Sequence, residues 1–187
     1  TGAKEHCVAF VADGVEGAEV WVDQATSMPH PDIKAYVVGF LFDPQLERVL
    51  CIRKLRPAWQ AGKLNGIGGH IEPGETALEA MEREASEEAG LGTHIVWKAF
   101  AGMDGLNDDG YPFSVDFFAA DKTQVGVPNT FGPFEARTDE QLEVWWVADI
   151  TTRRRDVVEN LPWLVGLAVD FLTDGRPTFT RIEYGTA

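Results

Sequence analysis

Residues 69–91 read GHIEPGETALEAMEREASEEAGL, a glycine-containing loop that leads into one short helix. Thr76 and Glu79 have the Thr-x-x-Glu spacing of a capping box, which satisfies the first backbone N–H groups of a helix. Gly90 stands where helices commonly end, because glycine adopts the left-handed conformation without strain. The sequence therefore predicts a helix from about Thr76 to Ala89.

This helix carries three glutamates on one flank. Glu84, Glu87 and Glu88 fall at positions i, i+3 and i+4, which places them side by side. They border an apolar stripe that we expect to be buried, whereas the opposite face is expected to be solvated. The expected stripe consists of Leu78, Met81, Ala85 and Ala89, and the solvated face of Glu79, Glu82 and Ser86.

The clustered glutamates have a structural and a functional interpretation. Like charges at these spacings destabilise a helix by about 0.2–0.5 kcal/mol per pair, so a helix with a purely structural role gains nothing from them. A bound divalent cation reverses the sign of this effect. The alternative is an ordinary solvated face, because glutamate is mostly exposed in proteins.

The complete segment resembles the Nudix box, the signature of the Nudix hydrolase family. The resemblance rests on residues at the family's spacing, which are Gly69, Glu75, Arg83, Glu84, Glu87, Glu88, Gly90 and Leu91. Ala85 departs from the pattern, since the family usually has a larger aliphatic residue there, and we expect this to affect packing rather than chemistry. The resemblance implies an α+β fold, a Nudix-type α/β/α sandwich with a mixed central sheet.

The order of the other predicted elements, over residues 33–172, is also similar to this family. Strands are predicted at Ile33–Phe42, Arg48–Leu55, Val144–Val147 and Thr178–Tyr184, apolar runs occur at Ile95–Ala101 and Phe113–Ala120, and an amphipathic helix is predicted at Val157–Leu172. Residues 7–22 predict an N-terminal hairpin. We expect a single domain over residues 1–187, with an N-terminal extension (1–32), a core (33–175) and a C-terminal strand (176–187).

Composition limits the classes of partner. The 187 residues are 44% hydrophobic, enough for one domain with a core, and the formal net charge is −14. This charge disfavours a nucleic-acid polymer, whose binding depends on lysine and arginine. A small phosphorylated substrate is compatible with it, because metal ions held by carboxylates let an acidic cleft accept anions.

The apolar runs are short, and the two cysteines lie inside them. None approaches the roughly 20 residues that span a bilayer, and the sequence shows no secretory signal. We therefore expect a cytoplasmic protein without membrane contact. Cys7 and Cys51 lack metal-ligand spacing and are expected to be small core residues.

The resemblance further implies a magnesium site. Glu84, Glu87 and Glu88 would ligate one or more Mg²⁺ ions, with Mn²⁺ as a substitute, and the carbonyl of Gly68 or Gly69 would add another oxygen. Magnesium suits this set because it prefers oxygen ligands. Bound magnesium would neutralise a diphosphate and activate a water for attack on phosphorus, and a glutamate would accept the proton.

Residues beyond the three glutamates are expected to complete the site. The resemblance implies that Arg83 and Glu75 orient the ligands through a charge-assisted pair. A further loop carboxylate usually completes such sites, and Glu140 is the first choice and Glu143 the second, with an exposed loop acid as the alternative interpretation. His70 follows the glycines and is expected to be solvated rather than catalytic.

The approach to the box, AGKLNGIGG at residues 61–69, resembles that of the oxidised-purine nucleoside triphosphate hydrolases within the family. In that subgroup an asparagine at the place of Asn65 reads the base, whereas a turn formed with Gly66 is the alternative. Strand alternation should send one of two adjacent tryptophans inward and the other outward, where it could stack on a base. The predicted substrate-binding residues are Asn65, Lys63, Trp145 and Trp146.

Three functions follow from these observations. The first is a pyrophosphohydrolase that converts a nucleoside triphosphate, with an oxidised purine as one option, to the monophosphate and pyrophosphate. The second is a hydrolase of a nucleoside diphosphate derivative, such as ADP-ribose, or of a dinucleoside polyphosphate, since these enzymes share the same box. The third is a Nudix-like binding module, which is disfavoured because every carboxylate of the box is retained. The oligomeric state stays open, with a homodimer among the options.

Overall fold

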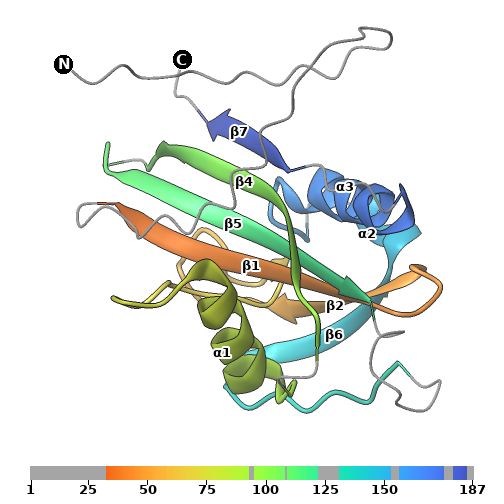
Figure 1. The fold of residues 1–187 in the computed structure, drawn as a ribbon. Coiled ribbons are helices and arrows are strands. Elements are labelled where there is room, and N and C mark those ends of the chain that lie inside the picture. Colours follow the sequence, from red (N-terminus) through yellow and green to blue (C-terminus); the bar gives the residue numbers. More distant parts are fainter. Residues whose placement is uncertain are drawn as a thin grey trace, which may run out of the picture.

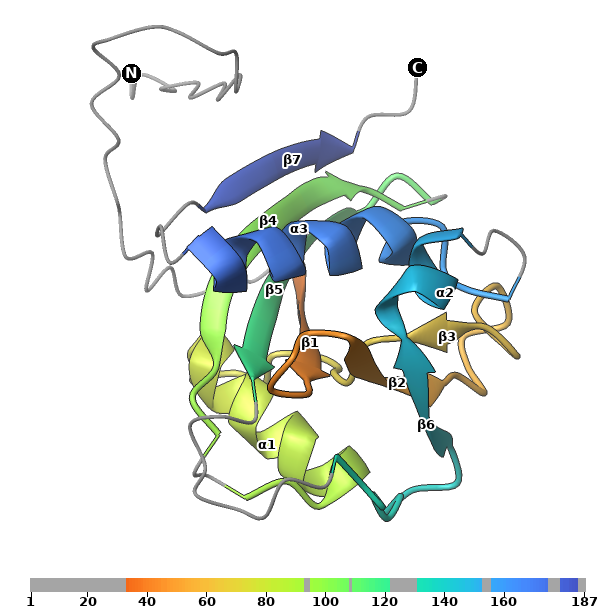
Figure 2. The same ribbon diagram turned by 90° about the vertical axis from the view of Figure 1, so that its right-hand side faces the viewer.

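The computed structural model describes residues 33–92, 95–107, 109–121, 131–152, 156–174 and 179–184. Within these ranges a mixed sheet lies between α1 on one face and the pair α2 and α3 on the other (Figures 1 and 2). This is the three-layered α+β sandwich that the sequence predicts. The predicted N-terminal hairpin and Cys7 lie outside the described residues.

The elements follow one another in an order that mixes parallel and antiparallel pairing. They are β1 (Lys34–Phe42), β2 (Arg48–Arg53), β3 (Leu64–Asn65), α1 (Ala77–Ala89), β4 (Lys98–Leu106), β5 (Pro112–Asp121), β6 (Gln141–Trp146), α2 (Val147–Thr152), α3 (Leu161–Asp174) and β7 (Thr180–Tyr184). The sheet order is β3-β2-β1-β5-β4-β7, and β6 also pairs with β2. The pairs β1–β5 and β4–β7 are parallel, and the other pairs are antiparallel. None of the helices in the described ranges has the length and apolarity that a membrane crossing requires.

The helix α1 begins and ends where its caps predict. The Thr76 hydroxyl accepts a hydrogen bond from the backbone N–H of Glu79, and the Glu79 carboxylate accepts one from the N–H of Thr76 at 2.8 Å. Gly90 ends the helix in the left-handed conformation, with φ of 62°. The predicted strands before the helix form the antiparallel pair β1 and β2.

The region before α3 differs from the prediction. Residues 147–152 form α2, a short helix that the sequence pattern does not reveal. The helix predicted from Val157 begins at Leu161, because the preceding segment pairs with Leu64 instead. The N–H of Leu64 donates to the carbonyl of Asp156, and the N–H of Val158 donates to the carbonyl of Leu64, both at 2.9 Å. These bonds hold residues 156–158 extended and delay the start of the helix.

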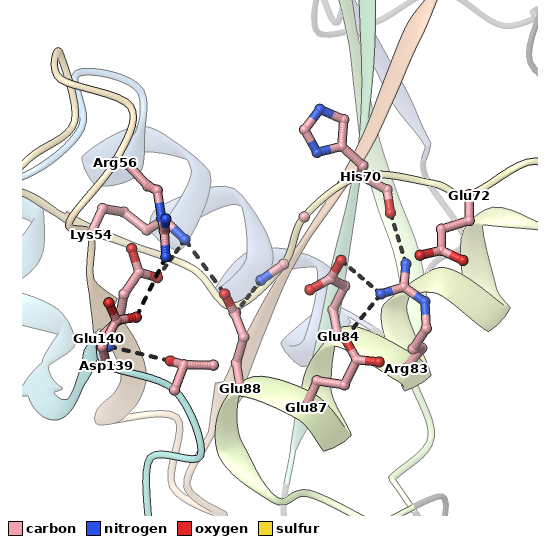
Figure 3. A pocket seen from close by; sticks show the side chains of 13 residues that line it. Lys54, Arg56, His70, Glu72, Arg83, Glu84, Glu87, Glu88, Asp139 and Glu140 are labelled. Atoms are coloured by element: carbon pink, nitrogen blue, oxygen red, sulfur yellow. Dashed lines mark hydrogen bonds and ion pairs between the residues drawn. The ribbon is translucent and has the colours of Figure 1, made fainter.

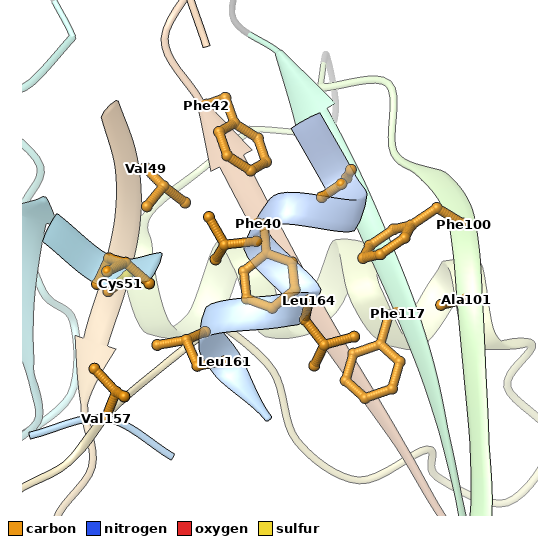
Figure 4. Packing of buried hydrophobic residues seen from close by; sticks show 14 of the residues in the cluster. Phe40, Phe42, Val49, Cys51, Phe100, Ala101, Phe117, Val157, Leu161 and Leu164 are labelled. Carbon is orange, nitrogen blue, oxygen red and sulfur yellow. The ribbon is translucent and has the colours of Figure 1, made fainter. Parts of the chain in front are cut away.

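Two apolar clusters fill the space on the two faces of the sheet. On one face four phenylalanines of the sheet pack with two leucines of α3 (Figure 4): Phe40, Phe42, Phe100, Phe117, Leu161 and Leu164. Cys51 lies fully buried in this cluster, as predicted. On the other face Met81, Ala85 and Ala89 of α1 pack against Val37 and Leu41 of β1.

The buried stripe of α1 is rotated slightly from the predicted one. Leu78 is 43% exposed, whereas Ala80 is fully buried and Ala77 packs against the cluster. The buried stripe therefore includes Ala77 and Ala80 in place of Leu78, and it keeps the predicted Met81, Ala85 and Ala89. This rotation brings Glu88 to the edge of the buried face, where it is only 8% exposed.

Candidate active site

A pocket of about 450 Å³ opens beside the second half of α1. Four segments line it, namely residues 54–56 after β2, the loop 68–72, the helical residues 83–88 and the segment 138–140 (Figure 3). These segments carry all four predicted catalytic carboxylates into one cavity: Glu84, Glu87, Glu88 and Glu140. The fold thus brings together acids that are more than 50 residues apart in the chain.

Glu88 lies at the inner wall of the pocket. One of its carboxylate oxygens accepts a hydrogen bond from the backbone N–H of Gly68 at 2.9 Å, and the other lies 3.5 Å from the ammonium group of Lys54. Burial raises the pKa of Glu88 above its ordinary value, and the negative charges of Glu84 and Glu140 add to the rise, while Lys54 and Gly68 oppose it. Glu88 is thus a buried acid held between the loop at Gly68 and the ammonium group of Lys54.

Glu140 is buried on the opposite side of Lys54. It is 6% exposed, and its carboxylate accepts hydrogen bonds from Lys54 Nζ and from the backbone N–H of Leu55, both at 2.7 Å. The segment before it is anchored to α1, because the N–H of Arg137 donates to the carbonyl of Glu88 at 3.0 Å. These bonds fix a loop acid in the pocket, so Glu140 is not the exposed acid of the alternative interpretation.

Arg83 connects the loop to the helix. Its guanidinium group binds both carboxylate oxygens of Glu75, at 2.8 and 3.0 Å, and donates to the carbonyl of His70 at 2.8 Å. The same group reaches Glu84 at 2.9 Å and Glu87 at 3.2 Å. Hydrogen bonding to Arg83 lowers the pKa of Glu75. The predicted contact between Arg83 and Glu75 is therefore present, and it anchors the loop beside the glutamates.

The glycines of the loop allow a close approach of backbone and carboxylate. A Cβ atom at Gly68, where φ is 150°, would lie 2.0 Å from the carbonyl oxygen of Val37. A Cβ atom at Gly69 would lie 2.3 Å from Oε1 of Glu84. Only glycine at position 69 therefore lets the Glu84 carboxylate lie directly against the loop.

The donor set of the pocket matches the chemistry of a hard cation. Carboxylates from α1 and from residue 140 supply oxygens, which are the ligands that Mg²⁺ prefers. In the described parts of the chain, however, no three acidic, histidine or cysteine side chains already stand together as a metal site. Instead Glu84 and Glu87 converge on Arg83, and Glu88 and Glu140 converge on Lys54 (Figure 3). The pocket thus contains the oxygens that a divalent cation needs, divided between two protein cations.

A family model for the NUDIX domain matches residues 32–151. The chain belongs to the NUDIX domain family. Its fold is similar to that of the NUDIX domain of Shewanella oneidensis NrtR in complex with ADP ribose, at 14% identity and a TM-score of 0.60 over 75% of this chain and 88% of that one. It is also similar to a C. elegans Ap4A hydrolase, at 15% identity and a TM-score of 0.59 over 76% and 99% of the two chains. The MutT protein from Bacillus halodurans matches at 17% identity and a TM-score of 0.54, over 82% and 91%.

These neighbours share the Nudix fold with this chain at identities that establish the fold alone. Family membership adds a statement about the cofactor, because Nudix hydrolases generally use divalent metals such as Mg²⁺. Membership of the family supports a Nudix hydrolase that acts on pyrophosphate bonds.

The predicted substrate-binding residues lie outside this Nudix pocket. The side-chain oxygen of Asn65 accepts the N–H of Gly66 at 2.9 Å, as in the alternative turn interpretation, and its amide contacts Gln60 at 3.4 Å. Lys63 is half-buried in the connection before β3 and does not line the pocket. The carboxylates that could hold a metal therefore lie together without any contribution from Asn65 or Lys63.

The two tryptophans lie at the far end of β2 from the pocket. Trp145 pairs with Val49 and Trp146 with Arg48, whereas the pocket opens beyond Arg53. Trp145 packs against the apolar cluster under α3 and Trp146 is 54% exposed, so the predicted alternation is confirmed. The register of β6 explains why neither tryptophan reaches the pocket.

Glu143, the second choice for the loop acid, is engaged elsewhere. Its carboxylate pairs with Arg53 on β2 and accepts the indole N–H of Trp145 at 2.8 Å. Hydrogen bonding to Arg53 lowers the pKa of Glu143.

His70 does line the pocket, but its ring packs against Tyr36 with centroids 4.3 Å apart, away from the carboxylates (Figure 3).

Sequence reasoning missed two basic residues of the pocket, Lys54 and Arg56. Lys54 contacts Glu88 and Glu140, which are 34 and 86 residues away in the chain. No local pattern marks such a residue, because its role depends on how the sheet and the two loops come together. Asp139, beside Glu140, lines the pocket as well.

Proposed function

We propose that this Nudix protein is a Mg²⁺-dependent pyrophosphohydrolase that converts a nucleoside triphosphate to a nucleoside monophosphate and pyrophosphate. The observation that carries the proposal is the gathering of Glu84, Glu87, Glu88 and Glu140 in one pocket. An oxidised purine is the base that the resemblance around Asn65 favours. A cytoplasmic location and a small nucleotide as the partner belong to the same proposal.

The residues divide the work according to their contacts. Glu84, Glu87 and Glu88 would hold the magnesium, together with a carbonyl oxygen of Gly68 or Gly69, and Mn²⁺ could take its place. Bound magnesium supplies charge neutralisation of the diphosphate and activation of a water as the nucleophile. Arg83 orients Glu84 and Glu87, to which it donates hydrogen bonds in the structure.

Glu140 is our candidate for the group that accepts the proton of the attacking water. It is a buried carboxylate in the same pocket, and Lys54 and the N–H of Leu55 hold it in place. A fixed carboxylate can act as a general base if its geometry reaches the water. The ammonium group of Lys54 compensates the charge that Glu140 retains.

A second candidate function has support from the neighbours. The described NUDIX domain of NrtR binds ADP ribose, and another neighbour is an Ap4A hydrolase. A nucleoside diphosphate derivative or a dinucleoside polyphosphate is therefore the alternative substrate, and a NUDIX domain that binds without turnover is the third reading of the same pocket.

A substrate panel with product identification tests these proposals. Purified protein is incubated with Mg²⁺ and a panel of substrates: nucleoside triphosphates, including oxidised purines, ADP-ribose and a dinucleoside polyphosphate. Nucleoside monophosphates, phosphate and pyrophosphate are then identified and quantified. We expect pyrophosphate and a nucleoside monophosphate from the triphosphates. Release of monophosphates from ADP-ribose alone would select the second candidate.

Two variants of α1 separate the pocket from the rest of the helix. Glu87→Gln removes a pocket carboxylate from a side chain that is 59% exposed, so the fold should be retained. We expect it to lower kcat at least 100-fold, in the range reported for the loss of one electrostatic group at a reacting centre. Glu82→Gln removes the same charge outside the pocket and should change kcat less than about two-fold, as surface changes away from a site usually do. Equal activities of the two variants would contradict the proposed site.

A further inference from the structure

The pocket contains three permanent cations with very different numbers of partners. Arg83 makes five contacts, to Glu75, His70, Glu84 and Glu87, which use every arm of its guanidinium group. Lys54 is enclosed between Glu88 and Glu140, and its side chain is 14% exposed. All five N–H donors of Arg83 are thus engaged, and the charge of Lys54 is compensated by two carboxylates.

Arg56 is held much more weakly. Its side chain is 79% exposed, and among the residues that the structure describes its one ion pair is with Asp139, at 3.7 Å from Nη2 to Oδ1. Asp139 is itself 66% exposed. Exposed ion pairs of this kind contribute little free energy, because water screens the charges. The guanidinium group of Arg56 therefore keeps most of its donors available, and that group binds phosphate in a bidentate manner.

The position of Arg56 indicates which part of a substrate its free donors could reach. The residues that line the pocket fall on two sides (Figure 3). One side carries Lys54, Arg56, Asp139 and Glu140, and the other carries Arg83, Glu84 and Glu87. An anion held at the glutamates of α1 must therefore extend across the pocket before it reaches Arg56. A third phosphate provides that extension in negative charge, whereas the sugar of ADP-ribose does not.

We propose that Arg56 is a specificity-determining residue that binds a phosphate outside the pair joined by the cleaved bond, and so favours substrates with three or more linked phosphates. This inference rests on the proposed function, because it takes the glutamates of α1 as the place of cleavage. The favoured class includes nucleoside triphosphates and dinucleoside polyphosphates, and ADP-ribose, with two linked phosphates, does not belong to it.

Steady-state kinetics with Mg²⁺ test the inference through the ratio of two substrates. In Arg56→Gln we expect KM for a nucleoside triphosphate to rise about ten-fold, the loss typical of one charge-assisted hydrogen bond, with kcat changed less than about two-fold. The KM for ADP-ribose should change much less, so that the preference for triphosphate falls. Arg56→Lys should recover part of the preference, because lysine keeps the positive charge but cannot bind a phosphate in a bidentate manner.

Lys34→Gln is the matched control. It removes one positive charge from an exposed residue at the start of β1 that does not line the pocket. If Lys34→Gln and Arg56→Gln raise KM equally, the effect is one of net charge and the inference fails. An equal rise of KM for both substrates in Arg56→Gln would also overturn it, since Arg56 would then bind a group that they share.

Calorimetry separates this inference from the proposed function, because it needs no turnover. Binding of inorganic triphosphate in the presence of Mg²⁺ should weaken about ten-fold in Arg56→Gln, by the same loss of one charge-assisted contact. It should strengthen in Asp139→Asn, which frees Arg56 from its carboxylate. A wild-type protein without hydrolytic activity but with this pattern of binding would refute the proposed function and support the role of Arg56. Unchanged binding in Arg56→Gln would refute the inference even if hydrolysis were confirmed.

Discussion

Lys54 lies with its ammonium group 2.7 Å from Glu140 and 3.5 Å from Glu88, and both acids are buried. Lys54→Met keeps most of the side-chain volume and removes the charge, which leaves two carboxylates without their counter-ion. We expect the free energy of unfolding to fall by about 2–3 kcal/mol, somewhat below the loss for a fully buried pair because the pocket is open to water. Urea unfolding without divalent cations measures this loss.

Two further variants test the cause of that loss. Lys98→Met removes an exposed lysine of β4 and should change stability by less than about 0.5 kcal/mol. Adding Glu140→Gln to Lys54→Met should restore part of the lost stability, because one uncompensated charge is removed. Additive losses in the double variant would contradict the contact described between Lys54 and Glu140.

Gly69 has no side chain, and this leaves space for the carboxylate of Glu84. In Gly69→Ala the new methyl group would overlap with Oε1 of Glu84, which is the end of a movable side chain. We therefore expect the carboxylate to swing away, so that kcat falls about ten-fold or more while stability changes by less than about 1 kcal/mol. Gly166→Ala in α3 is the control, since a methyl group there meets open space and should leave kcat unchanged. Full activity of Gly69→Ala would show that the position of Glu84 is unimportant.

At the scale of elements, α1 depends on its N-terminal cap. Thr76 and Glu79 exchange hydrogen bonds there, and the next turns carry the pocket glutamates. We expect Thr76→Ala to lower the free energy of unfolding by about 1 kcal/mol, the usual loss for a threonine cap. Thr76→Ser keeps the hydroxyl and should lose much less. Urea unfolding of both variants provides the measurement, and equal losses would mean that the methyl group of Thr76, rather than its cap, matters.

The strand β7 joins the sheet beside a pair of acids on β4 and β5. Arg181 of β7 forms an ion pair with Asp104, and Asp116 lies partly buried nearby on β5. Burial raises the pKa of Asp116 above its ordinary value, with Asp104 adding to the rise and Arg181 opposing it. The folded state therefore binds the proton of Asp116 more tightly than the unfolded state does.

This difference predicts a pH dependence of stability. Between the ordinary carboxyl pKa and the raised one the folded state binds more protons, so Asp116 makes stability fall as pH rises through that window. In Asp116→Asn this contribution is absent. The stability of the variant relative to the wild type should thus increase from pH 3.5 to pH 7, measured by chemical unfolding at each pH. Asp109→Asn, an exposed control in the β4–β5 connection, should show no such trend. A relative stability of Asp116→Asn that falls over this range would reverse the sign of the argument.

At the scale of the whole molecule, local sequence signals predict the helix and its acids but not the pocket around them. The cap at Thr76, the stop at Gly90 and the spacing of the glutamates all act within a few residues, so the pattern alone locates α1. The resemblance to the Nudix box extends this to the contact of Arg83 with Glu75 and to the fold. The placement of Glu140 also follows from the resemblance, and the structure puts it in the pocket.

The missing parts depend on contacts between distant segments. Lys54 and Arg56 acquire their surroundings only when the end of β2 meets α1 and residues 138–140. The late start of α3 likewise follows from the pairing of residues 156–158 with Leu64. Short patterns carry no information about such pairings. They also predict substrate contacts for Trp145 and Trp146, whereas the register of β6 keeps both away from the pocket.

A thermal unfolding series with increasing Mg²⁺ tests most directly whether the acids of α1 gather a divalent cation in this pocket. A ligand that binds the folded state at 100 times its Kd adds about 2.7 kcal/mol, which corresponds to a rise of about 5–10 °C in Tm for a domain of this size. We predict this rise for the wild type and for the control Glu82→Gln/Glu159→Gln, whose acids lie outside the pocket, and its loss in Glu84→Gln/Glu87→Gln. An equal rise in both double variants, or no rise in the wild type at any Mg²⁺ concentration, would contradict the magnesium site.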